Sequence, residues 1–213
     1  MLHSPPEKRP RPPEAARGAS LWRGLRIGLL GGSFNPAHGG HRHISLLALK
    51  RLGLDYVWWL VSPQNPLKSA KGMAPLAERL NGAAAIARHP RILVRNLEAE
   101  LGTRYTAETL KQLQALHPAT HFVWIMGADN MLQLPEWRQW RRIICTVPIA
   151  IFDRPHYFLR ANSGKAAGAY RRHRLSEARA RHLADKKSPA WTFVHIPTSG
   201  LSATRIRAER LTK

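Results

Sequence analysis

Residues 25–43 read LRIGLLGGSFNPAHGGHRH and place a predicted strand, a glycine loop and a predicted helix start in direct succession. The apolar run at 27–30 is typical of a strand buried on both faces of a parallel sheet. Gly31 and Gly32 end this run, because glycine permits torsions and close approaches that a side chain blocks. Free backbone N–H groups and the dipole of the following helix converge at such a junction. The stretch therefore predicts an anion-binding site.

The rest of the chain is long enough for one substantial core and does not require two. Among its 213 residues there is one cysteine, Cys145, which excludes an intrachain disulfide and is expected to be buried in an apolar stretch. No apolar run approaches the roughly 18 to 20 residues of a membrane span, and no signal peptide is evident. We expect a cytoplasmic protein, with a disordered, basic, proline-rich arm at 1–24 and one domain at 25–213.

The formal net charge of +21 would suit a polyanionic partner such as nucleic acid. This charge is concentrated in the arm and in residues 154–187. Because arginine greatly outnumbers lysine, compositional bias alone can produce such blocks, and a solvated surface is favoured over a role in nucleic-acid binding.

Predicted strands and helices alternate along the chain. Further strands are expected at 56–61, 91–97, 122–126, 147–152 and 191–196, and helices at 40–52, 76–88, 106–116, 168–184 and 202–211. This order predicts an α/β fold with a Rossmann-like, doubly wound, mostly parallel sheet and helices on both faces. Ligands bind such sheets at the carboxyl ends of the strands, where strand order reverses.

Two distant motifs, GGSFNPAHGGH at 31–41 and GLSATRIR at 200–207, resemble the paired signature of the HxGH nucleotidyltransferase superfamily. Four segments between them resemble the bacterial nicotinate-nucleotide adenylyltransferase branch, namely NPLK at 65–68, RYTAET at 104–109, GADN at 127–130 and PEW at 135–137. The resemblance implies transfer of the adenylyl group of ATP, with Mg²⁺, to nicotinate mononucleotide, giving deamido-NAD and pyrophosphate in NAD biosynthesis.

By this resemblance, His38 and His41 are catalytic and donate hydrogen bonds to the triphosphate as charge builds on the leaving group. The alternatives are a structural pair at a helix start, or a metal site with His43, although no cysteine cluster or carboxylate pair lies nearby. No resident metal site is predicted. The other implied contacts to ATP or its phosphates are Gly31, Gly32, Ser33, Phe34, Gly40, Asp129, Ser202, Thr204 and Arg207.

Several of these contacts have plainer alternatives. Asp129 suits a ribose hydroxyl and equally a helix N-cap. Ser202 would be an N-cap and Arg207 a solvated charge if the first motif were absent. Asn35 stands where many members have Asp, which removes one carboxylate near the triphosphate.

The resemblance assigns the acceptor, nicotinate mononucleotide, to Trp137, Tyr105, Thr106 and Lys68. A flat pyridine ring needs a π face, which Trp137 offers, and its carboxylate needs aligned donors such as backbone N–H groups at Tyr105 and Thr106. Lys68 lies in a proline-containing loop and suits a phosphate contact made on loop closure. Alternatively, Trp137 belongs to the core and Lys68 is an ordinary exposed lysine.

Two other functions stay open. A sister transferase acting on nicotinamide mononucleotide or phosphopantetheine would keep both phosphate motifs, although His38 argues against the phosphopantetheine branch, which usually has Thr there. A nucleic-acid-binding protein that reuses a nucleotide fold is the more remote alternative. Formation of a homo-oligomer is compatible with each of these functions.

Overall fold

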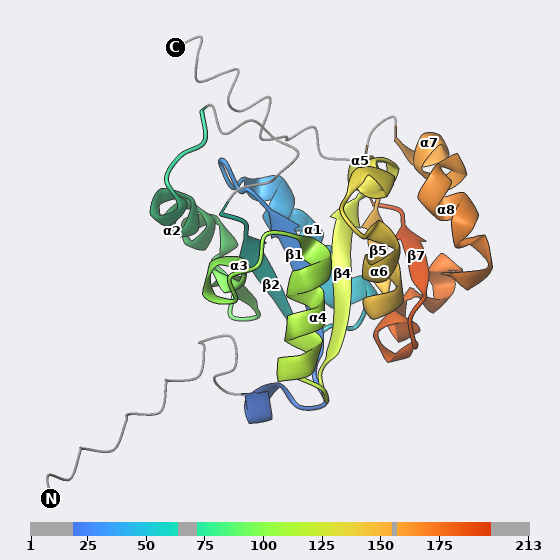
Figure 1. Ribbon diagram of the computed structural model, residues 1–213, viewed down its shortest axis with the longest axis horizontal. Coiled ribbons are helices and arrows are strands. Elements are labelled where there is room, and N and C mark those ends of the chain that lie inside the picture. Colours follow the sequence, from blue (N-terminus) through green and yellow to red (C-terminus); the bar gives the residue numbers. More distant parts are fainter. Residues whose placement is uncertain (1–18, 64–71, 155–156, 197–213) are drawn as a thin grey trace, which may run out of the picture.

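A seven-stranded sheet forms the centre of the computed structural model, which describes residues 19–63, 72–154 and 157–196. All strand pairs in it are parallel, in the order β3-β2-β1-β4-β5-β7-β6 (Figure 1). The strands are β1 Arg26–Gly32, β2 Tyr56–Val61, β3 Ile92–Arg95, β4 His121–Gly127, β5 Ile149–Phe152, β6 Arg174–Leu175 and β7 Trp191–Val194. The predicted doubly wound parallel sheet is confirmed.

The order of the strands reverses at β1. Leu29 of β1 is in register with Trp58 of β2 on one side and with Trp124 of β4 on the other. The chain builds β2 and β3 outward from one edge of β1, and β4 and β5 outward from the other. The carboxyl end of β1, which carries Gly31 and Gly32, therefore lies at the switch point where such folds bind ligands.

Helices cover both faces of the sheet. They are α1 Gly39–Arg51, α2 Leu76–Ala87, α3 Leu97–Glu100, α4 Thr106–Leu116, α5 Ala128–Gln133, α6 Trp140–Thr146, α7 Phe158–Ser163 and α8 Lys165–Ala169. Short 3-10 helices lie at η2 Ala19–Trp22, η3 Leu134–Glu136, η4 Arg171–His173 and η5 Glu177–Asp185. In Figure 1, α4 and α6 lie in front of the sheet and α1 lies behind it.

The two faces of the sheet carry two separate apolar cores. On β2, the fully buried Trp58 packs with α4 and α6, whereas its neighbour Trp59, also fully buried, packs with α1 and α2. Successive strand residues point to opposite faces, so a strand covered on both sides must be apolar at every position. This requirement explains why the run YVWWLV was recognisable as a strand.

Several local predictions are wrong. The helix expected at 168–184 is broken after α8, because Arg174 and Leu175 pair with β7 as the edge strand β6 before η5 begins. Cys145 is exposed.

Other element boundaries shift only slightly. The N-cap of α4 is Tyr105, and Thr106 is the first helical residue. Strand β3 ends at Arg95, because the chain turns into α3 at Leu97. The helix expected at 202–211 lies outside the described residues.

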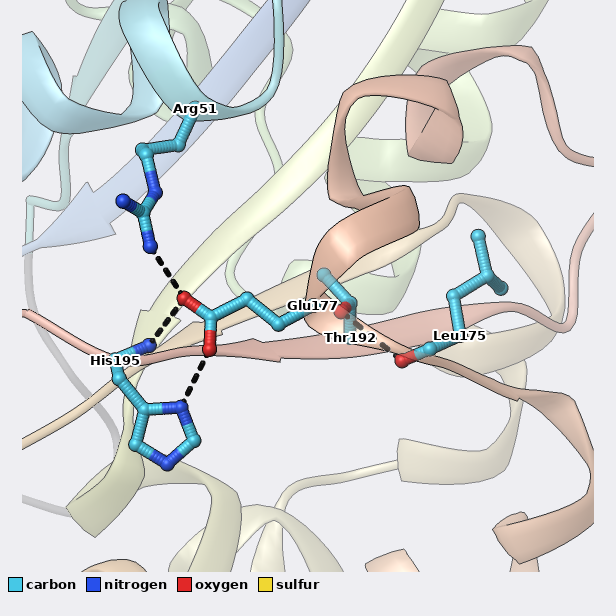
Figure 2. A network of polar contacts seen from close by, with 5 residues as sticks. All are labelled: Arg51, Leu175, Glu177, Thr192 and His195. Atoms are coloured by element: carbon cyan, nitrogen blue, oxygen red, sulfur yellow. Dashed lines mark hydrogen bonds and ion pairs between the residues drawn. The ribbon is translucent and has the colours of Figure 1, made fainter.

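Glu177, the first residue of η5, ties this segment to α1 and to the end of β7. Its Oε1 accepts hydrogen bonds from Arg51 Nη2 at 2.5 Å and from His195 N at 3.1 Å, and its Oε2 lies 2.6 Å from His195 Nδ1 (Figure 2). Desolvation pushes the pKa of Glu177 upward, but the hydrogen bonds from His195 and Arg51 outweigh it and leave the pKa below its ordinary value. Beside it, Thr192 Oγ1 donates to the Leu175 carbonyl oxygen at 3.1 Å.

The fold extends before residue 25. Trp22 of η2 makes edge-to-face contacts with Tyr56 and Trp58, each at a centroid distance of 5.2 Å, and its carbonyl oxygen accepts a hydrogen bond from Thr120 Oγ1. Trp22 therefore packs on the domain, and the division into an arm and one domain stays a prediction. Within the described ranges, no helix has the length and apolar character needed to span a bilayer.

Candidate active site

His38 and His41 cap the N-terminus of α1 reciprocally. The Nδ1 atom of His38 accepts a hydrogen bond from the Gly40 amide at 3.1 Å, and the Nδ1 atom of His41 accepts one from the His38 amide at 3.2 Å. The two rings lie 3.9 Å apart between centroids. This is a capping box in which two imidazoles replace the usual hydroxyl and carboxylate.

The caps determine which ring nitrogens carry protons. A neutral imidazole has one donor and one acceptor nitrogen, so an Nδ1 that accepts a backbone N–H leaves the proton on Nε2. Both His38 and His41 therefore present an Nε2–H donor. Desolvation and then the positive charge of Arg154 lower the pKa of His38, which keeps this buried ring neutral.

The capping bonds also involve backbone amides at the start of α1. The Gly40 amide donates to His38 Nδ1, and the His41 amide donates to the His38 carbonyl oxygen at 3.0 Å. The amides of Gly40 and His41 are thus engaged within the cap.

The Phe34 ring lies between His41 and Trp59 and contacts both. Its ring stacks on Trp59 at 5.0 Å and contacts His41 at 4.7 Å between centroids. Its backbone has a φ of 46°, in the left-handed region that is unfavourable for a residue with a side chain. Because the Phe34 side chain is 2% exposed, burial of its ring offsets this strain. Trp59 is itself held by a 2.8 Å hydrogen bond from Nε1 to Ser45 Oγ.

Gly31 is required by a neighbour on β4. A Cβ atom added at Gly31 would lie 2.4 Å from Cη2 of Trp124, a distance that real Cβ atoms essentially never show. The indole therefore occupies the space that any side chain at this position would need, and the end of β1 approaches β4 as bare backbone.

Two adjoining pockets open at the carboxyl ends of the strands. The inner pocket is lined by Gly31, Gly32, Ser33, Ser62, Glu98, Arg104, Thr106, Trp124, Asn130 and Trp137. The outer pocket is lined by Arg104, Tyr105, Thr106, Glu136, Trp137, Arg138 and Ile143. Arg104, Thr106 and Trp137 line both, so the glycine loop and the predicted acceptor residues border one continuous recess.

The start of α4 offers backbone donors at this recess. Its N-cap, Tyr105, makes no side-chain cap hydrogen bond. The amide of Glu108 donates to the Tyr105 carbonyl oxygen at 2.9 Å, but the amides of Thr106 and Ala107 have no partner among the described residues. Uncapped amides and the positive end of the dipole suit a carboxylate.

Asp129 is held at the start of α5 by Arg154, which follows β5. Arg154 Nη1 lies 3.1 Å from Asp129 Oδ2 in a half-buried ion pair. Asp129 Oδ1 is buried and has no hydrogen-bond partner in the described part of the chain. One carboxylate oxygen is thus fixed and the other is left to accept a hydrogen bond. Sequence reasoning missed Arg154, which it placed in a solvated basic block.

Arg79 is a second residue that sequence reasoning missed. Its side chain is buried, and its guanidinium donates to four backbone carbonyl oxygens. The acceptors are Ser33 and Ser62, both from Nη1 at 2.7 and 2.6 Å, Pro63 from Nη2 at 2.8 Å and Ala74 from Nε at 2.9 Å. Burial lowers the pKa of Arg79. This residue joins the glycine loop to both ends of the 64–71 segment.

Glu98 is the third missed residue. It is a buried carboxyl of α3 that lines the inner pocket, and desolvation raises its pKa although a hydrogen bond with Ser62 opposes the shift. Only its position three residues after the short strand β3 could have drawn attention to it.

The other predicted site residues have different outcomes. Lys68, Ser202, Thr204 and Arg207 lie outside the described residues. His38, His41 and Phe34 are close together but do not line either pocket. Within the described ranges, no group of three His, Cys, Asp or Glu side chains could hold a metal ion, so the alternative of a site with His43 gains no support.

Comparison with solved structures supports the fold. The Plasmodium falciparum nicotinic acid mononucleotide adenylyltransferase complexed with NaAD superposes with a TM-score of 0.64 at 19% identity, covering 86% of this chain and 83% of that one. Its complex with APC gives a TM-score of 0.63 at 18% identity, with the same coverage. At such identities the likeness concerns the fold alone.

Sequence comparison is more specific. Residues 29–209 match the family model described as cytidylyltransferase-like. A probable nicotinate-nucleotide adenylyltransferase of Parvibaculum lavamentivorans is 53% identical over 192 residues, which cover 90% of this chain and 96% of the relative. One from Cereibacter sphaeroides is 54% identical over 182 residues, covering 85% and 96%. With over half of the residues identical across nearly the whole length of these relatives, the chain belongs to the nicotinate-nucleotide adenylyltransferase family, within the cytidylyltransferase-like group.

Proposed function

We propose that this protein transfers the adenylyl group of ATP to nicotinate mononucleotide, producing deamido-NAD and pyrophosphate in NAD biosynthesis. One observation carries the proposal: Thr106 and Trp137, the predicted acceptor residues, line the same recess as the glycine loop at the switch point. Family membership, with relatives of that name at 53–54% identity, supports it independently.

The reaction is an in-line displacement at phosphorus. An oxygen of the mononucleotide 5'-phosphate attacks the α-phosphorus of ATP and forms a new P–O bond, while the bond from this phosphorus to the bridging oxygen breaks and pyrophosphate leaves. No covalent enzyme intermediate is needed, so positioning and charge stabilisation supply most of the rate.

His38 and His41 suit the stabilising role. Each presents an Nε2–H donor whose orientation is set by the cap on its Nδ1 atom. We assign these donors to phosphate oxygens of ATP, where negative charge accumulates as pyrophosphate departs. Asp129 Oδ1, which has no partner in the described chain, suits a ribose hydroxyl.

The acceptor would bind in the outer pocket. The Trp137 indole offers a face for the pyridine ring, and the amides at the start of α4 suit its carboxylate. The proposal also includes the phosphate contacts that the family resemblance assigns to Lys68, Ser202, Thr204 and Arg207. Mg²⁺ enters with ATP as part of the substrate and neutralises phosphate charge. A cytoplasmic location, where ATP is available, is part of the proposal.

A pyrophosphate-release assay tests the proposed function. The protein is supplied with ATP, Mg²⁺ and, in separate reactions, nicotinate mononucleotide, nicotinamide mononucleotide or phosphopantetheine. We expect the highest kcat/KM with nicotinate mononucleotide, and mass spectrometry should identify deamido-NAD. A clearly higher kcat/KM with either other acceptor would assign the chain to a sister transferase instead.

A further inference from the structure

The acid and amide forms of the acceptor differ at one group, a carboxylate against a carboxamide. Backbone N–H donors, such as those of Thr106 and Ala107, can bind a carbonyl oxygen of either group. A positive charge distinguishes the two, because only the carboxylate is attracted to it. The residues around the outer pocket therefore bear on the choice of acceptor.

Two arginines border the outer pocket next to the predicted ring-binding residues. They are Arg104, which precedes α4, and Arg138, which follows Trp137. Neither guanidinium belongs to any of the ion pairs that the described residues form. One exposed carboxylate, Glu136, also lines the pocket, which leaves an excess of one positive charge among the lining residues.

Arg138 differs from Arg104 in being held in place. Its guanidinium carbon lies 4.6 Å from the centroid of the Tyr105 ring, in a cation–π contact. Tyr105 directly precedes Thr106 and Ala107 of α4, whose amides have no partner in the part of the chain that the structure describes. Stacking restricts a long side chain at low entropic cost and leaves the N–H donors in the guanidinium plane available for hydrogen bonds. The charge is thus fixed beside the amides that suit the carboxylate.

We propose that Arg138, stacked on Tyr105, is the residue that makes this enzyme prefer the acid form of the acceptor. This inference rests on the proposed function and deepens it. The backbone amides bind the exocyclic group of either acceptor, and Arg138 adds a charge-assisted interaction that only the carboxylate receives.

The chain contains a matched control for Arg138. Arg141 is another exposed arginine, three residues further on, and its guanidinium carbon lies 5.0 Å from the centroid of the Trp140 ring. It has the same charge and a similar aromatic support but does not line either pocket. Substitution of Arg141 therefore reproduces the loss of one charge and one cation–π contact away from the site.

The experiment measures kcat/KM for nicotinate and nicotinamide mononucleotides in the wild type and in R138Q, R138K, R104Q and R141Q. We expect R138Q to lower the acid-to-amide ratio on the order of tenfold by reducing the value for the acid. R138K should restore part of the ratio, because the charge returns without the planar donor set. R104Q should lower the ratio less than R138Q, and R141Q should leave it unchanged.

The outcomes separate the inference from the proposed function. A wild type without adenylyl transfer to nicotinate mononucleotide would overturn the proposed function. An active wild type whose ratio is unaltered in R138Q, or in which R138Q reduces both acceptors equally, would overturn only the role of Arg138. A larger effect of R104Q than of R138Q would do the same.

Discussion

Arg79 Nη1 donates a hydrogen bond to the Ser33 carbonyl oxygen at 2.7 Å, and so connects α2 with a loop 46 residues earlier in the chain. The same guanidinium holds the carbonyl oxygens of Ser62 and Ala74, on either side of the 64–71 segment. A single buried cation therefore connects the glycine loop to the chain at Ser62 and at Ala74.

Replacing Arg79 should destabilise the protein. R79A leaves several buried carbonyl oxygens without donors, each costing about 1–3 kcal/mol, so we expect a loss of at least about 3 kcal/mol in the free energy of unfolding. R79K should lose less, because it retains a charged donor. Urea unfolding measures the change. Exposed Arg88, at the end of the same helix, is the control, and R88A should stay within about 0.5 kcal/mol of the wild type. A similar small loss in R79A would contradict the clamp.

Replacing His41 should affect turnover far more than stability. H41A removes one Nε2–H donor, which we expect to lower kcat by about 100- to 1,000-fold. It also removes the acceptor for the His38 amide, at a cost of about 1 kcal/mol in the free energy of unfolding. Steady-state kinetics and thermal unfolding measure the two effects separately. H43A, two residues further along α1, should change neither, and a merely modest loss of turnover in H41A would favour the structural alternative.

The lowered pKa of His38 predicts that the protein loses stability in mild acid. Between the ordinary value of 6.5 and the lower folded-state value, the unfolded chain binds a proton that the folded chain does not. The free energy of unfolding should therefore fall as pH falls below 6.5. H38N retains a side chain suited to an N-cap but cannot titrate, so this variant should lack that part of the decline. Urea unfolding at several pH values between 5 and 8 tests this, and parallel curves for both proteins would contradict it.

The raised pKa of Glu98 predicts that the free energy of unfolding falls as pH rises, which is opposite to the effect of His38. Its folded-state pKa lies above the ordinary 4.5, so the folded protein retains a proton that the unfolded chain has already lost. This contribution lowers stability as pH rises from 4.5 through the folded-state value. E98Q removes the titration, and the difference in unfolding free energy between E98Q and the wild type should shift in favour of E98Q over that range. A difference independent of pH would show that Ser62 stabilises the charged carboxylate.

The features that could be predicted from the sequence are those encoded by neighbouring residues. Strand β2 and helix α4 have the predicted bounds, because an apolar run and a 3.6-residue period are local signals. The strand–glycine–helix junction with His38 was recognisable for the same reason. Family resemblance then supplied Tyr105, Thr106 and Trp137, which the fold brings together in one pocket.

What could not be predicted depends on contacts between distant segments. Arg79 looks like an ordinary charged residue of an amphipathic helix, and only the folded chain shows its carbonyl partners. Arg154 was hidden in a run of basic residues, although it pairs with Asp129 25 positions away. The helix expected at 168–184 is wrong for the same reason: its middle pairs with β7, and helical periodicity does not reveal that pairing.

The reciprocal caps of His38 and His41 mean that the two imidazole rings are oriented when helix α1 forms. Each imidazole already has a defined tautomer and orientation before any nucleotide arrives, because helix α1 cannot begin in this way without both bonds. In the proposed reaction, ATP would meet preorganised donors, and little of its binding energy would be spent on arranging them. If the proposed role of the two histidines is correct, the start of one helix couples folding to transition-state stabilisation.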